Sequence, residues 1–189
     1  MLSGLVLAGG ESRRMGRDKS ALQLADGRTL LHRQVAILRE AGATVVQVSL
    51  RPGSIADCAG VRVVVDQLEQ AGPLAGIAAG LQEAPEGLVL VLAVDMPGIT
   101  TGHLRQLLEL ATPECGVVPM VAGNCEPLVA VYPSGLAASA AAWLAGGQRA
   151  VHAWVASEVE QGRLRRWDAP ADWAAAVRSW NSPADLPGA

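Results

Sequence analysis

A glycine-rich segment at residues 7–20, LAGGESRRMGRDKS, carries the side chains best suited to chemistry. Its glycines allow the backbone to bend sharply and to present consecutive N–H groups to an anion. Its cations are Arg13, Arg14, Arg17 and Lys19. Backbone N–H groups and clustered cations after a strand are what a polyphosphate requires. A solvated basic turn would have the same composition and is the alternative.

Lys19 is the only lysine of the chain, and all other basic residues are arginines or histidines. A lone lysine indicates that a compact ammonium is needed at this point. The spacing excludes two familiar phosphate-binding motifs. The dinucleotide fingerprint needs G-x-G-x-x-G, but here two adjacent glycines are followed by none until Gly16. The P-loop needs adjacent Gly and Lys, whereas Arg17 and Asp18 separate Gly16 from Lys19.

Two aspartates, Asp66 and Asp95, each directly follow an apolar run, at residues 61–65 and 88–94. In a parallel sheet both would project from the edge at which the glycine-rich segment begins. Carboxylates at that edge could hold Mg²⁺, which takes one or two carboxylates together with substrate phosphates. The alternative is that each aspartate caps a turn or the next helix.

The elements that position these residues follow from the apolar patterning. Strands are predicted at residues 5–8, 44–50, 61–65, 88–94, 116–120 and 128–132, and helices at 29–41, 73–84, 101–111, 135–144 and 150–157. Apolar strands that alternate with helices predict a mostly parallel sheet covered on both faces, a three-layer α/β/α, Rossmann-like fold. Without a linker or an internal repeat, residues 1–189 are interpreted as one domain.

The composition excludes several classes of function. A net charge of −3 with 17% charged residues gives no electrostatic footprint for coating nucleic acid. No apolar run approaches the length of a membrane span. The sparse cysteines, Cys58, Cys115 and Cys125, lack metal-binding spacing and predict buried thiols in a reducing compartment. We therefore expect a cytoplasmic protein with neither a nucleic-acid nor a membrane partner.

The glycine-rich segment resembles the signature L-A-G-G-x-S-x-R-M-G-x-D-K of the MobA family, the molybdenum cofactor guanylyltransferases. The similarity continues in order through Asp66, GPLAG at 72–76, DMP at 95–97, EPL at 126–128 and NSPADL at 181–186. It therefore covers essentially the whole chain. The resemblance implies a nucleotide-diphospho-sugar transferase-like fold. It also implies transfer of GMP from GTP to the molybdenum–molybdopterin cofactor, with release of pyrophosphate and with Mg²⁺, or alternatively Mn²⁺.

The resemblance also implies roles for individual residues of this chain. Those that would bind the guanine nucleotide are Leu7, Ala8, Gly9, Gly10, Lys19, Asp66 and Asp95. Asp95 would hold the metal, and Lys19 and Arg14 would stabilise charge on the leaving pyrophosphate. Asn181 would face the pterin. Transient contacts with other proteins of cofactor biosynthesis are a further implication.

Two positions depart from the family pattern: Val48 and Ser179 stand where asparagines often occur. One alternative function therefore keeps the chemistry and changes the substrate, as a cytidylyltransferase for the same cofactor or a transferase for another phosphorylated acceptor. Gly9 favours guanine, since the cytidylyl relatives typically resemble L-A-A-G. The other alternative is a non-catalytic nucleotide-binding module, which the presence of Lys19 and Asp95 disfavours.

All five tryptophans lie in the C-terminal quarter, as do Arg163, Arg165 and Arg166. Pterin rings stack on aromatic side chains and phosphates bind arginine, so this region could hold the second substrate. The favoured interpretation is packing, because Trp173 and Trp180 have the spacing of one buried helix face.

Overall fold

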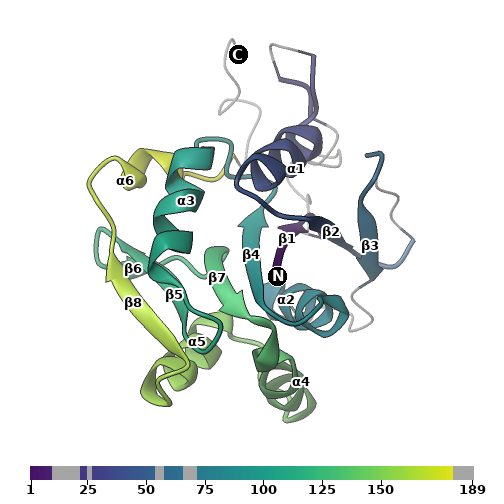
Figure 1. Cartoon of the computed structure of the whole chain (residues 1–189). Coiled ribbons are helices and arrows are strands. Elements are labelled where there is room, and N and C mark those ends of the chain that lie inside the picture. Colours follow the sequence, from purple (N-terminus) through teal and green to yellow (C-terminus); the bar gives the residue numbers. More distant parts are fainter. Residues whose placement is uncertain (10–21, 25–26, 54–57, 66–71, 181–189) are drawn as a thin grey trace.

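Parallel strands form one half of the sheet in the computed structural model, which describes residues 1–9, 22–24, 27–53, 58–65 and 72–180 (Figure 1). Strand β1 (Leu2–Leu7) lies between β2 (Val45–Leu50) and β4 (Leu88–Ala93) and is parallel to both. Strand β3 (Arg62–Val65) pairs in parallel with β2. The carboxyl ends of these four strands therefore share one edge, as the sequence predicts.

The other half of the sheet is mixed. Strand β7 (Val129–Pro133) runs antiparallel to β4 and to β5 (Gly116–Val121). Beyond β5 lie the parallel β8 (Leu164–Asp168) and the short antiparallel β6 (Asn124–Cys125). Because Val129 pairs with Leu92, β7 enters the sheet at the edge where β4 leaves it.

Helices cover both faces of the sheet, so the predicted three-layer arrangement is confirmed (Figure 1). One face is packed by α1 (Leu30–Glu40), α3 (Thr101–Leu110) and the short α6 (Trp173–Ala176). The other is packed by α2 (Pro73–Glu83), α4 (Ala137–Ala145) and α5 (Val151–Glu160), with a 3₁₀ turn at Ser134–Leu136 before α4. Among the described residues, none of these helices combines the length and the apolar character needed to cross a bilayer.

Packing accounts for the most deeply buried tryptophans. Trp154 lies against Tyr132 with ring centroids 5.4 Å apart, and Trp173 donates from Nε1 to Oε1 of Gln106 over 2.9 Å. The packing interpretation is therefore confirmed for these two. The expectation that Trp173 and Trp180 share a helix face is wrong, because α6 ends at Ala176. The cysteines are half-buried, not fully buried as expected.

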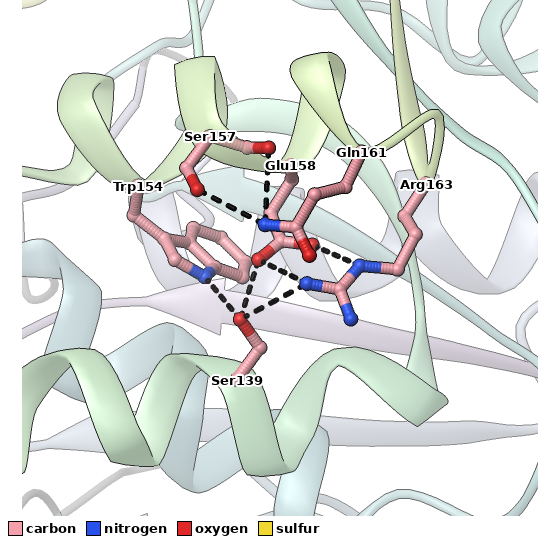
Figure 2. A network of polar contacts seen from close by, with 6 residues as sticks. All are labelled: Ser139, Trp154, Ser157, Glu158, Gln161 and Arg163. Carbon is pink, nitrogen blue, oxygen red and sulfur yellow. Dashed lines mark hydrogen bonds and ion pairs between the residues drawn. The ribbon is translucent and has the colours of Figure 1, made fainter.

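A polar network joins α4, α5 and Arg163, the residue that precedes β8 (Figure 2). The buried carboxylate of Glu158 forms an ion pair with Arg163, with Nε and Oε2 2.6 Å apart and Nη2 donating to Oε1 over 2.9 Å. Ser139 donates from Oγ to the same Oε1 and accepts from Nε1 of Trp154 over 3.3 Å. Because a buried charge is costly unless it is paired, this network fixes how α4 and α5 pack against each other and against the turn before β8.

Candidate functional site at the carboxyl edge of the sheet

The end of β1 lies directly beside the end of β4. Leu7 is in register with Ala93, and the N–H of Val94 donates to the carbonyl of Leu7 over 3.1 Å. On the other side, the N–H of Ala8 donates to the carbonyl of Ser49 over 3.0 Å. The structure therefore brings the start of the glycine-rich segment and Asp95 to adjacent strand ends.

Asp95 lies in the turn that follows β4. Its neighbours Val94, Met96 and Pro97 are buried, whereas Asp95 itself is half-buried. The buried neighbours hold the backbone of the turn in place, while Asp95 remains partly exposed at the edge of the sheet. The carbonyl of Asp95 accepts a hydrogen bond from the N–H of Trp180, over 2.8 Å.

Helix α2 starts at this edge and packs closely on β1 and β2. Gly72, at φ 71°, precedes Pro73 in the first turn, where a missing N–H is tolerated. A Cβ at Gly76 would lie 2.6 Å from Oγ of Ser49 and 3.0 Å from Cδ2 of Leu7. The GPLAG motif therefore has a packing reason: its second glycine lets the helix approach the strand ends.

Glu126, from the EPL motif, reaches the same edge because it precedes β7. The carbonyl of Leu128 accepts from the N–H of Ala93 over 2.8 Å, which places the motif beside the end of β4. Burial raises the pKa of the Glu126 carboxyl, and the nearby His152 lowers it by less. Burial likewise raises the pKa of the adjacent Cys125 thiol, against an opposing effect of Arg166.

Several candidate residues lie outside the described part of the chain: Gly10, Arg14, Lys19, Asp66 and Asn181. Their roles stay predictions. Val48, which stands where an asparagine often occurs in the family, lies within β2. Its side chain is fully buried in the core under α1, and Arg51 is the first residue beyond β2.

Sequence reasoning missed Gln34, on α1, which contacts the turn that holds Asp95. Its side chain is fully buried. A signal was present, because Gln34 is a polar residue on the same helix face as Leu31, Val35 and Leu38.

The described residues fit a metal ion whose ligands come partly from the protein and partly from a substrate. Among them, no group of three or more histidine, cysteine, aspartate or glutamate side chains could enclose an ion. Asp95 is one of the carboxylates at the edge, and a single carboxylate suits Mg²⁺, which keeps several waters and takes substrate phosphates as ligands. An all-protein metal cage is not what this part of the chain provides.

The fold is that of solved nucleotidyltransferases. The chain superposes on molybdopterin-guanine dinucleotide biosynthesis protein A from Archaeoglobus fulgidus with a TM-score of 0.71, at 23% identity, over 98% of this chain and 95% of that one. It superposes equally well on 2-C-methyl-D-erythritol 4-phosphate cytidylyltransferase from Thermus thermophilus, with a TM-score of 0.71 at 22% identity, over 96% and 94%.

Sequence comparison identifies the family within this fold. The model of the MobA-like NTP transferase domain matches residues 4–162, and the chain belongs to that family. It is 43% identical over 167 residues to a probable molybdenum cofactor guanylyltransferase of Opitutus terrae, covering 87% of this chain and 82% of that protein. A protein of Mycobacterium tuberculosis with the same description is 40% identical over 159 residues, covering 82% and 79%.

Proposed function

We propose that this protein is a molybdenum cofactor guanylyltransferase. It transfers GMP from GTP to the terminal phosphate of the molybdenum–molybdopterin cofactor and releases pyrophosphate. The family match and the names of the curated relatives support this substrate pair.

One structural observation carries the proposal. The hydrogen bond from Val94 to Leu7 joins the two strand ends from which the glycine-rich segment and Asp95 emerge. A nucleotide whose phosphates lie over this edge would meet both. Ligands of open α/β sheets bind at the carboxyl ends of the strands, so the place agrees with the general rule.

The reaction joins two anions, so charge neutralisation and in-line positioning dominate the chemistry. Leu7, Ala8, Gly9 and Gly10 present backbone along the nucleotide, and Asp66 contributes to its binding. Lys19 and Arg14 stabilise negative charge on the departing pyrophosphate. No covalent intermediate with the protein is needed.

Asp95 is the residue that would hold Mg²⁺ or Mn²⁺. The bound cation would supply neutralisation of charge on phosphate oxygens during the transfer. On the acceptor side, Asn181 would bind the pterin. Trp180 precedes it in the sequence and is hydrogen-bonded to Asp95, which supports placing acceptor and metal at one site.

The test is pyrophosphate release with each of four nucleoside triphosphates, molybdenum–molybdopterin and Mg²⁺. Release with GTP alone is the expected result. Release with CTP in place of GTP would make the protein a cytidylyltransferase and overturn the proposed donor. Absence of release with every nucleotide, for protein that binds GTP, would support a non-catalytic nucleotide-binding module instead.

A further inference from the structure

The turn after β4 has its backbone carbonyls engaged from two sides. Trp180 donates to the carbonyl of Asp95. The carbonyls of Ala93, Val94 and Met96 all accept from Nε2 of Gln34, over 3.2, 3.4 and 3.0 Å. Every carbonyl from residue 93 to 96 therefore has a donor.

Gln34 is held in the orientation that these contacts need. Its oxygen Oε1 accepts from Nη1 of Arg33 over 3.0 Å, so the amide nitrogen faces the turn. Arg33 also donates from Nη2 to the carbonyl of Ile99 over 2.8 Å, which fixes the far end of the same turn. The side chain of Gln34 is fully buried, where lost hydrogen bonds are not replaced by water.

These contacts restrain the backbone of the turn. The Asp95 side chain departs from a main chain that is fixed on both sides, by Gln34 at positions 93, 94 and 96 and by Trp180 at 95. Mutation of a group that orients a metal ligand without touching the metal typically lowers metal affinity or activity by about 10- to 100-fold.

We infer that Gln34 is a positioning residue that sets the Asp95 carboxylate for the divalent cation; the inference rests on the proposed role of Asp95 as the metal ligand. Gln34 lies on α1, the first described helix after the glycine-rich segment.

The test substitutes Gln34→Met, which keeps the volume of the side chain and removes the donor. Gln47→Met is a matched control, since Gln47 is also fully buried and its side chain has no hydrogen-bond partner among the described residues. Mn²⁺ affinity is measured from the EPR signal of the free ion, with GTP present and no acceptor. The Mg²⁺ concentration for half-maximal pyrophosphate release is measured separately.

For Gln34→Met we expect about tenfold weaker Mn²⁺ binding and a similar rise in the Mg²⁺ requirement. Gln47→Met should match the wild type in both. A role in folding alone would lower the melting temperature of Gln34→Met and leave the metal affinity of the folded protein unchanged. That result would overturn the inference.

Two further variants test the positioning role and the metal ligand separately. Arg33→Met removes the group that orients Gln34 and leaves the buried amide in place, so it can be tested even if Gln34→Met does not fold. It should also weaken Mn²⁺ binding. Unchanged Mn²⁺ binding by folded Arg33→Met would overturn the inference. Asp95→Asn separates the two claims. If Asp95→Asn weakens Mn²⁺ binding and Gln34→Met does not, only the positioning role fails. If Asp95→Asn binds Mn²⁺ like the wild type, the proposed metal ligand itself is wrong.

Discussion

The backbone N–H of Trp180 donates a hydrogen bond to the carbonyl oxygen of Asp95, with nitrogen and oxygen 2.8 Å apart. This bond connects the last described residue of the chain to the turn after β4. The side chain of Trp180 also packs against the core that lies under α1 and α3. The C-terminal segment thus contributes to the edge of the sheet where phosphate chemistry is proposed.

Trp180→Pro should reduce activity more than Trp180→Ala does. Proline has no N–H, so it removes the bond to Asp95, whereas alanine removes only the packing of the ring. One hydrogen bond of about 1 kcal/mol corresponds to about a fivefold difference in kcat/KM between the two variants. Steady-state pyrophosphate release measures it. Equal activities would show that the bond does not support catalysis.

Lys19→Ala should lower kcat by roughly a hundred- to a thousandfold, as for the loss of one preorganised donor to a developing charge. Lys19→Arg is the matched variant, since it keeps the charge and changes its shape. We expect little recovery in Lys19→Arg, because the lone lysine indicates a compact ammonium. A near-normal rate for Lys19→Ala would remove this residue from the mechanism.

Much of the fold can be read from the sequence because its central strands are continuous apolar runs. The strand predicted at 88–94 is β4, which ends one residue earlier, at Ala93. Strand β8 could not be found this way, since its LRRWD sequence exposes Arg165 and Arg166. The start of β1 was also missed. Ser3 and Gly4 are not typical strand residues, and Gly4 is favoured by close packing on Leu38, 3.1 Å from where its Cβ would be.

The site was predictable to the extent that it depends on topology. Aspartates that follow parallel strands of one sheet must lie at the same edge, and the end of β4 confirms this for Asp95. The role of Gln34 depends on contacts with carbonyls 59 to 62 residues further along the chain. No local pattern encodes such contacts, because they form only when α1 packs beside the end of β4.

Gly9→Ala should leave the fold intact and change nucleotide preference. A Cβ at this position would have ordinary contacts, the nearest being 3.5 Å from Cγ of Arg51. A methyl group in a binding site changes discrimination by about tenfold or more. We expect the ratio of kcat/KM for GTP to that for CTP to fall by about tenfold, with an unchanged melting temperature.

Gly76→Ala is the contrasting control for this experiment. Its Cβ would lie 2.6 Å from Oγ of Ser49 and 3.0 Å from Cδ2 of Leu7, so these side chains or α2 must shift, at a cost of about 1–3 kcal/mol of stability. Gly76→Ala should therefore lower the melting temperature. An unaltered GTP preference in stable Gly9→Ala would contradict a role for this glycine in choosing the base.

Glu126→Gln should be more stable than the wild type near neutral pH. Burial raises the pKa of Glu126 above its ordinary value of 4.5, so the folded state binds the proton more tightly than the unfolded state. The contribution of Glu126 to stability is then fully present below pH 4.5 and is lost as the pH rises through the folded pKa. The glutamine variant has no charge to desolvate and escapes this loss.

Thermal unfolding at several pH values measures the effect. At pH 7.5 the melting temperature of Glu126→Gln should exceed that of the wild type by about 2 °C, and the gap should close at pH 4. Glu114→Gln, on an exposed side chain, should show no such pH-dependent gap. A gap that stays constant from pH 4 to pH 7.5 would contradict the proposed cause.

Arg163→Ala tests the network of Figure 2, because it leaves the carboxylate of Glu158 buried without its ion-pair partner. The Glu158 side chain is 1% exposed and that of Arg163 is 41% exposed. We expect a loss of about 2 kcal/mol in urea denaturation, below the cost of breaking a wholly buried pair since water reaches the arginine. Arg165→Ala, on the exposed part of β8, is the control and should stay within about 0.5 kcal/mol of the wild type.

The double variant Glu158→Met, Arg163→Met separates the ion pair from the packing of α4, α5 and the turn before β8. It removes both charges and keeps apolar volume, so the desolvation penalty disappears together with the attraction. We expect it to recover most of the stability that Arg163→Ala loses, since replacing a buried pair by packed apolar side chains is often neutral or stabilising. A double variant as unstable as Arg163→Ala would show that the pair itself holds these elements together.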